Sequence, residues 1–275
     1  MNILLCVKQV PDTTEIKIDP VKNVLIREGV PSVLNPFDSY ALEAAARIKD
    51  NVPGTKIVVL SMGPMQAQAA LRECLSIAAD KAYLISGRCF GGSDTLATSY
   101  ILSCAIRKIE ETEGKFDAVF CGKQAIDGDT AQVGPEIAEH LGLPQITYGI
   151  EAETGWKDGR EILKVKKETE GGYEIVAAKM PCLVTFTKPS WEVRYPTIPR
   201  KLEAEKALIP VLNEEDLQMI DVKRIGLRGS PTRVKKTFVP LRRKECTLIN
   251  EGSSVKSARK LFEILADKNL IHISL

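Results

Sequence analysis

The sequence predicts an α/β protein built on a mostly parallel, twisted sheet with helices on both faces. Across the first half of the chain, short apolar runs alternate with longer stretches of helical periodicity, which is the pattern of strands joined by crossover helices. Later the pattern changes to strands without intervening helices, which indicates an antiparallel extension. The expected fold is therefore Rossmann-like, although the motif Gly-x-Gly-x-x-Gly occurs nowhere in the chain.

Composition agrees with such a fold. Of 275 residues, 44% are hydrophobic and 27% are charged, which is ordinary for a soluble globular protein. A net charge of +2 neither favours nor excludes a polyanionic partner, and we expect no nucleic-acid ligand. Residues 1–8 read as a first strand rather than a signal peptide, and no apolar run approaches the length of a membrane span. We expect a cytoplasmic protein that does not insert into a membrane.

The first elements follow one another closely. Residues 3–7 form an apolar run suited to a buried strand. Residues 15–27 read as a hairpin, because isoleucines alternate with charged residues before an Asp-Pro turn and a second apolar run. A helix is expected from Asn35 and Pro36, since Asn is a preferred N-cap and Pro suits the first helical position.

The remaining elements complete a domain that we expect to end at residue 186. Strand and helix patterns alternate, with strands expected over 56–60, 82–85 and 117–121 and helices over 67–75, 96–109 and 130–141. The antiparallel extension is expected to comprise strands over 162–165, 173–178 and 183–186.

The remainder of the chain, residues 187–275, differs in character. Residues 188–244 carry about twice as many basic as acidic residues, prolines recur and periodicity fades. Such a stretch cannot bury enough apolar surface by itself, so we expect it to pack on another surface. Residues 253–268 have the pattern of an amphipathic helix. We therefore expect an extended basic arm that ends in a helix.

Seven cysteines are scattered through the chain, and no two form a Cys-x-x-Cys pair. An odd number without a secretory leader does not indicate a disulfide framework. Only His140 and His272 can supply imidazole, so a metal or iron–sulfur site is disfavoured as well. We expect the cysteines to be small buried hydrophobic residues, and we expect no metal site.

The richest candidate site is the loop over residues 122–130. In an open parallel sheet, ligands bind at the carboxyl ends of the strands, and this loop follows an expected strand. Its two glycines permit close approach of the backbone, an acid or hydroxyl can cap the next helix, and the free N–H groups there form an anion site. A lysine can add a cation, and a glutamine can bind a base or ribose; these residues are Gly122, Lys123, Gln124, Gly128, Asp129 and Thr130. The alternative is a turn whose glycines only relieve steric strain.

A second loop, over residues 90–98, has a similar pattern. Gly91 and Gly92 permit close approach, Asp94 is a good N-cap, and Thr95 and Thr98 place hydroxyls one helical turn apart. Taken alone, this loop is better explained by N-capping without a ligand.

The chain offers little for acid–base catalysis. His140 reads as a structural or surface residue, and Asp127 and Asp129 read as capping acids. Because no triad or metal cluster is visible, we expect no catalytic residue that acts alone. Any redox chemistry would belong to a bound organic cofactor.

Residues 122–135, GKQAIDGDTAQVGP, resemble the motif of electron transfer flavoprotein β subunits. Matching stretches lie at 6–10, 35–38 and 141–145, and an Arg-Tyr pair at 194–195 also fits. The resemblance spans nearly the whole chain. It implies a heterodimer with an α subunit that carries its own FAD, with the basic arm clasping that subunit and residues 187–191 near the docking site of a flavin-dependent dehydrogenase.

The resemblance also implies an adenine-nucleotide site. The positions that carry it are Cys6, Asn35, Pro36, Phe37, Asp38, Met62, Gly122, Lys123, Gln124, Ala125, Ile126, Asp127, Gly128, Asp129, Thr130, Ala131, Gln132 and Val133.

Two branches of the family differ in the nucleotide that they hold. In one, AMP is a structural ligand and the β subunit is a scaffold. In the other, the β subunit holds a second FAD, accepts hydride from NADH and passes electrons to ferredoxin and, through the α-subunit FAD, to or from the dehydrogenase. The second branch is favoured because its hydroxyl-rich turn resembles the one formed here by Gly91, Gly92, Asp94, Thr95 and Thr98.

Overall fold

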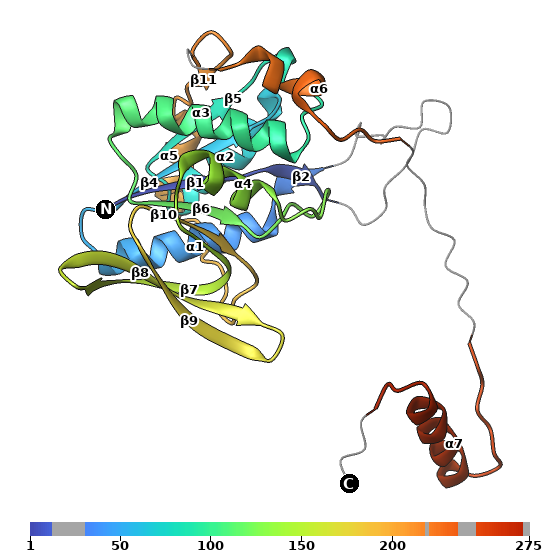
Figure 1. Ribbon diagram of the computed structural model, residues 1–275. Helices are drawn as coiled ribbons and strands as arrows, with labels where there is room; N and C mark the ends of the chain where they lie inside the picture. Colours follow the sequence, from blue (N-terminus) through green and yellow to red (C-terminus); the bar gives the residue numbers. More distant parts are fainter. Residues whose placement is uncertain (13–30, 218–219, 236–245, 272–275) are drawn as a thin grey trace. The chain divides into compact units, whose positions relative to one another are not determined.

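The computed structural model describes residues 1–12, 31–217, 220–235 and 246–271 (Figure 1). Contacts group the chain into two compact units, Met1–Lys235 and Lys236–Leu275. The hairpin expected over 15–27 and the residue His272 lie outside the described residues.

A nine-stranded sheet forms the centre of the first unit (Figure 1). Neighbouring strands are parallel from β11 to β7, and β8 and β9 extend that edge with antiparallel pairing. In spatial order the strands are β11 (Val211–Leu212), β5 (Lys81–Ile85), β4 (Lys56–Met62), β1 (Asn2–Cys6), β6 (Ala118–Gly122), β10 (Cys182–Phe186), β7 (Gln145–Lys157), β8 (Arg160–Thr169) and β9 (Gly172–Lys179). The predicted fold class is confirmed.

The order of the strands reverses at the middle of the sheet. From β1 the chain moves outward to β4 and β5, and it then crosses to β6 on the other side of β1. In open α/β sheets such a reversal leaves a crevice outside the carboxyl ends of the two central strands, and ligands bind there. Next to this end lies a small antiparallel pair, β2 (Gln9–Pro11) and β3 (Ser32–Leu34).

Helices cover both faces of the sheet. Successive strand residues point to opposite faces, so Ile3 and Leu5 lie in one apolar core and Leu4 lies in the other. The first core is closed by α1 (Pro36–Asn51) and α2 (Gln68–Ile77), and the second by α3 (Thr95–Glu113) and α4 (Val133–Leu141).

One strand direction was wrong in the sequence-based prediction. Residues 183–186 were expected in the antiparallel extension, but β10 lies between β6 and β7 and is parallel to both. The chain makes the β7–β9 excursion and then returns into the sheet. Every residue of β10 is buried, and such an apolar run indicates a strand covered on both faces without revealing its direction.

Part of the basic stretch belongs to the first unit. Helix α5 (Ile198–Lys206) packs on α2, where the Arg200 guanidinium donates to the carbonyl oxygens of Leu75 and Ala79 at 2.9 and 2.8 Å. Strand β11 pairs with β5. The clasping of an α subunit by residues 187–275 stays a prediction.

The second unit contains α7 (Ser254–Asp267), the predicted amphipathic helix. The Ser253 hydroxyl caps it by accepting a hydrogen bond from the Lys256 N–H at 3.3 Å. Its apolar residues Val255, Leu261 and Phe262 are exposed. Neither α7 nor any other helix in the described part of the chain combines the length and apolarity of a membrane span.

A network of charged and polar side chains links the end of α3 to the amino-terminal ends of β4 and β5. The buried Glu113 carboxylate, at the end of α3, accepts hydrogen bonds from Lys56, from Lys81 at 2.8 Å and from the Tyr83 hydroxyl at 2.5 Å. Burial favours the neutral acid, but these three donors outweigh it and lower the pKa of Glu113 to about 2.

Glu113→Gln is expected to lower the free energy of unfolding by about 2 kcal/mol, because it leaves two lysines without their buried partner. A depressed pKa means that the stabilisation is complete above the ordinary pKa of 4.5 and is lost as the pH falls towards 2. Urea unfolding at neutral and acid pH measures both effects. Glu111→Gln, which breaks an exposed pair with Lys108, is the control; an equal loss in both variants would contradict the account.

Candidate functional site

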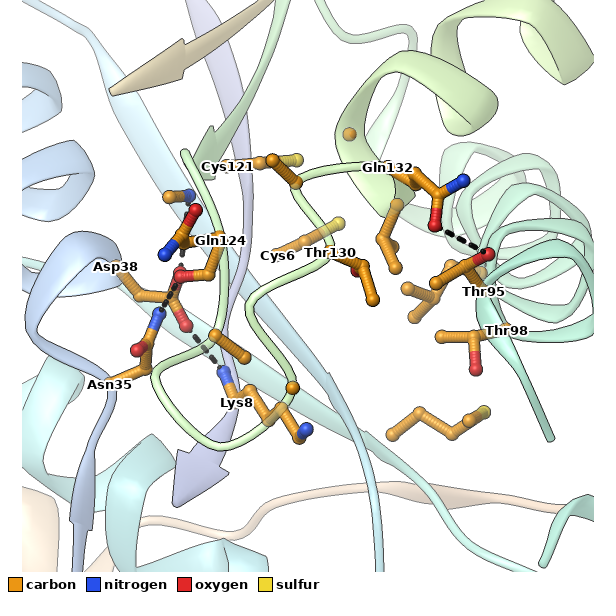
Figure 2. A pocket seen from close by; sticks show the side chains of 18 of the residues that line it. Cys6, Lys8, Asn35, Asp38, Thr95, Thr98, Cys121, Gln124, Thr130 and Gln132 are labelled. Carbon is orange, nitrogen blue, oxygen red and sulfur yellow. Dashed lines mark hydrogen bonds between the residues drawn. The ribbon is translucent and has the colours of Figure 1, made fainter. Parts of the chain in front are cut away.

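A cavity of about 440 Å³ opens at the carboxyl ends of β1, β4 and β6. It lies at the point where the strand order reverses, and the first turns of α3 and α4 form one wall (Figure 2). Most of the predicted cofactor-binding residues line it: Cys6, Asn35, Asp38, Met62, Gly92, Asp94, Thr95, Thr98, Gly122, Lys123, Gln124, Ala125, Gly128, Thr130, Ala131, Gln132 and Val133.

The other predicted residues lie around the cavity but do not line it: Pro36, Phe37, Gly91, Ile126, Asp127 and Asp129. Two of these acids are held by neighbours. The Asp127 carboxylate accepts from the Lys8 ammonium at 2.7 Å, and the Asp129 carboxylate accepts from the Gln124 amide at 2.7 Å. These bonds hold the loop together, and the predicted capping role of Asp127 and Asp129 is wrong, because α4 begins after Gln132 without a side-chain cap.

The cavity is also lined by residues that the sequence analysis did not assign to the site: Val7, Lys8, Phe90, Ser93, Leu102, Cys121 and Gly134. Two of them could have been predicted from the sequence, because Lys8 and Cys121 lie close to the carboxyl ends of the two central strands, where a ligand is expected. Leu102 follows Thr95 and Thr98 at helical spacing on the wall that α3 presents.

The start of α1 joins the two central strand-end loops. Asn35 occupies the N-cap position but makes no capping bond with its side chain. Its amide instead donates to the Gln124 carbonyl oxygen at 2.8 Å (Figure 2). The amide oxygen accepts from the Ile126 N–H at 3.2 Å. The buried Asp38 carboxylate accepts from the Lys8 N–H at 2.7 Å and the Gly122 N–H at 3.1 Å. Asn35 and Asp38 thus fix the position of both loops.

Two opposed effects act on Asp38. Burial raises the pKa of its carboxyl to about 7, while hydrogen bonds from Asn35, Lys8 and Gly122 work in the opposite direction. The two backbone donors require an acceptor at each oxygen, so the ionised form completes the link between the loops.

Only one of the two glycines in the 122–130 loop is required by packing within the chain. A Cβ on Gly122 would lie 2.3 Å from Asp38 Oδ1 and 2.7 Å from the carbonyl carbon of Phe37. A Cβ on Gly128 would meet nothing within 4 Å. Close backbone contact therefore explains Gly122, whereas Gly128 leaves open space beside the cavity.

The loop reaches α4 through an unusual backbone. Asp129 and Ala131 have φ values of 53° and 54°, in the left-handed region that costs non-glycine residues about 1 kcal/mol or more. The helix was expected to begin at residue 130 under a side-chain cap. It begins at Val133, and its N-cap residue Gln132 makes no capping bond with its side chain. Val133 and Gly134 line the cavity, so the start of the helix faces it as an anion site.

The loop before α3 is anchored mainly within the chain. The Asp94 carboxylate caps α3 by accepting from the Ala97 N–H at 3.0 Å, which confirms the predicted N-cap, and its other oxygen accepts from the Thr232 hydroxyl at 2.8 Å. Gly92 has a φ of 75°, and a Cβ there would lie 2.7 Å from the Leu227 side chain. Contacts with residues 227–232 thus explain why this loop has Gly92 and Asp94, without a ligand.

The two threonines differ in their surroundings. The Thr95 hydroxyl lies 3.2 Å from Glu136 Oε1 and 3.5 Å from Gln132 Oε1, which links α3 to α4 across the cavity wall (Figure 2). Thr98 lies one turn further along α3 and lines the same wall.

The cysteines were expected to be buried, and His140 was expected to be a structural or surface residue; most of these expectations are met. Cys6, Cys74, Cys104, Cys121 and Cys182 are buried, but Cys89 is half-buried and Cys246 is exposed. His140 packs edge to face on Tyr100, with ring centroids 5.8 Å apart, and burial lowers its pKa. The described residues contain no group of three or more His, Cys, Asp or Glu side chains arranged to hold a metal ion.

The chain is similar to electron transfer flavoproteins over most of its length. The family described as "Electron transfer flavoprotein domain" matches residues 22–217. "Electron transfer flavoprotein subunit beta" of Megasphaera elsdenii is 52% identical over 245 residues, which cover 88% of this chain and 89% of that protein. "Caffeyl-CoA reductase-Etf complex subunit CarD" of Acetobacterium woodii is 44% identical over 271 residues, 98% of this chain and 100% of that protein. "Protein FixA" of Azorhizobium caulinodans is 43% identical over 265 residues, 96% of this chain and 94% of that protein.

Proposed function

Since this chain belongs to the electron transfer flavoprotein family as a β subunit, we propose that it holds FAD, accepts hydride from NADH and passes electrons to ferredoxin. Through the FAD of its α subunit it exchanges electrons with a flavin-dependent dehydrogenase. The observation that carries the proposal is the cavity at the strand-order reversal, where two glycine loops and the start of α4 meet.

The residues of the cavity suit a nucleotide. Its volume of about 440 Å³ falls within the range of roughly 300–1,000 Å³ that is usual for cofactor sites. The start of α4 offers N–H groups to phosphate, and Lys123 also lines the cavity as a cation, whereas the Lys8 ammonium is paired with Asp127. Gln124 lines the same loop and offers an amide to a ribose or base.

A bound flavin would supply the hydride and single-electron chemistry. The chain itself binds and orients the ligand. Asn35 and Asp38 hold the loops after β1 and β6, α4 presents its N-terminal N–H groups, and the threonines of α3 line the wall beside them.

The same wall supports FAD over the alternative ligand, AMP. Thr95 lies beside the start of α4, and Thr98 continues the polar lining one turn further along α3, which would suit a ligand that reaches past the start of α4 and is longer than AMP. The name of CarD places that relative in a complex of a reductase with an Etf, which supports a dehydrogenase-type partner here. With AMP, the chain would act as a scaffold for the α-subunit FAD.

The partner proposal rests on α7 and on the family. An α subunit would cover the exposed apolar face formed by Val255, Leu261 and Phe262. We also propose that the complex works in the cytoplasm.

Replacing Thr95 and Thr98 together with valine tests the FAD assignment. The change removes two hydroxyls at nearly constant volume, and the β-subunit flavin should be lost, with at least about a tenfold fall in NADH-dependent ferredoxin reduction. The α-subunit flavin should remain. Flavin released from the purified complex and the rate of ferredoxin reduction are the measurements.

Thr112→Val is the matched control, because Thr112 is an exposed residue at the far end of the same helix. If the double variant kept its full flavin content and activity, the threonine wall would have no part in cofactor binding.

A further inference from the structure

Glu136 places a carboxyl group against the wall of the cavity. It lies in the first turn of α4, and its Oε1 atom is 3.2 Å from the hydroxyl of Thr95, which lines the cavity. Its Oε2 atom is buried and has no hydrogen-bond partner among the described residues. An ionised carboxylate in this position keeps a charged oxygen out of water without a donor, which is costly.

The neighbouring hydroxyl of Ser99 cannot relieve this. It donates its hydrogen to the Leu96 carbonyl oxygen at 2.9 Å, so its oxygen can only accept. A neutral Glu136 has a hydrogen to donate to that oxygen, whereas an ionised Glu136 has none. An ionised Glu136 therefore accepts from Thr95 alone, and its second carboxylate oxygen has no donor among the described residues.

Among the described residues, the groups that act on the pKa of Glu136 include no cation. Burial raises the pKa of Glu136, the charge of Asp94 adds to this, and the hydrogen bond with Thr95 opposes it. The basic groups Arg107 and Arg224, the latter in η3 (Val222–Arg224), act on His140 instead. On the strands packed against α4, Cys121 of β6 and Thr185 of β10 face the helix beside Gly134.

We propose that Glu136 is a positioning residue that takes up a proton when an anionic nucleotide enters the cavity. The inference rests on the proposed function. In the empty protein the start of α4 favours a negative charge in its first turn. A phosphate bound at the start of α4 would repel the negative charge of an ionised Glu136. An ionised Glu136 would therefore oppose binding of the nucleotide. A neutral Glu136 does not repel the phosphate.

The direction of the linkage follows. The nucleotide raises the pKa of Glu136, so the complex carries more protons than the empty protein at any pH between the two pKa values. Affinity should fall as the pH rises through that interval, by up to about tenfold per pH unit.

Calorimetric titration of the full-length chain, freed of bound nucleotide, measures the protons directly. ADP is the probe, because it carries the adenosine and the pyrophosphate of FAD. Titrations at matched pH in pairs of phosphate-free buffers that differ in their enthalpy of ionisation, from about pH 5 to about pH 9, give the proton uptake from the difference in observed heat. In the wild type, the number of protons taken up per ADP bound should rise towards one at a pH between the two pKa values of Glu136. Glu136→Gln should bind ADP without that uptake, and Glu139→Gln, an exposed residue of the same helix, should match the wild type.

The outcomes separate the two proposals. ADP binding without proton uptake in the wild type, or unchanged uptake in Glu136→Gln, overturns the role of Glu136 and leaves the nucleotide site intact. In the second case Asp38, the other cavity carboxyl with a raised pKa, would carry the proton. Failure of the wild type to bind ADP at any pH would overturn both the site and this inference.

Discussion

Gly122→Ala is expected to weaken nucleotide binding by about 100-fold and to lower the free energy of unfolding by about 2 kcal/mol. The added Cβ would lie 2.3 Å from Asp38 Oδ1, 2.7 Å from the carbonyl carbon of Phe37 and 2.8 Å from the Asp38 nitrogen. Two of these atoms are backbone, so a side-chain rotation cannot relieve the contact. The β6 loop or the start of α1 must shift, and the Asp38 bridge to Lys8 and Gly122 is lost with it.

Calorimetric titration with ADP and urea unfolding measure the two effects. Gly171→Ala is the matched control: Gly171 lies in the turn between β8 and β9, and a Cβ there meets nothing within 4 Å. We expect that variant to match the wild type in both measurements. If Gly122→Ala bound ADP normally, the exact position of the β6 loop would have no bearing on the ligand.

Truncation after Lys235 is expected to abolish co-purification with the α subunit while leaving the first compact unit folded. The cut removes α7 and its exposed apolar face and retains the whole nine-stranded sheet. Circular dichroism and thermal unfolding test the fold, and gel filtration of co-expressed subunits tests the complex. A stoichiometric heterodimer formed by the truncated chain would contradict the arm's role.

The position of that cut matters. A cut after residue 186, where the sequence alone suggests a boundary, would also remove α5 and β11. Arg200 would no longer bind the carbonyl oxygens at the end of α2, and β5 would lose its outer neighbour. Such a chain would confuse loss of folding with loss of binding.

The main features of the fold could be predicted from the sequence because they depend on local patterns. Apolar runs such as residues 3–7 and helical periodicities such as 96–109 identify the elements, and the parallel alternation places the strand ends together. The cavity at β1 and β6 follows from that arrangement. The N-cap role of Asp94 was also predictable, since it depends on residues close by in the chain.

Features that depend on contacts between distant residues could not be predicted in this way. Asn35 has the sequence pattern of an N-cap, yet its amide binds Gln124 and Ile126 in the loop after β6. Glu136 has the pattern of an ordinary first-turn acid, and its orphaned oxygen becomes evident only when α3 packs on α4. The direction of β10 depends on the route of the chain through the β7–β9 excursion.

The nucleotide content of the intact complex tests the central claim most directly. Co-purified subunits are denatured, and the released nucleotides are separated and counted against protein; reduction of the flavin by NADH is then followed in the undenatured complex. We expect two FAD per heterodimer, little AMP, and bleaching of flavin absorbance on addition of NADH. One FAD and one AMP per heterodimer, with no hydride accepted from NADH, would contradict the account and leave the chain as a scaffold.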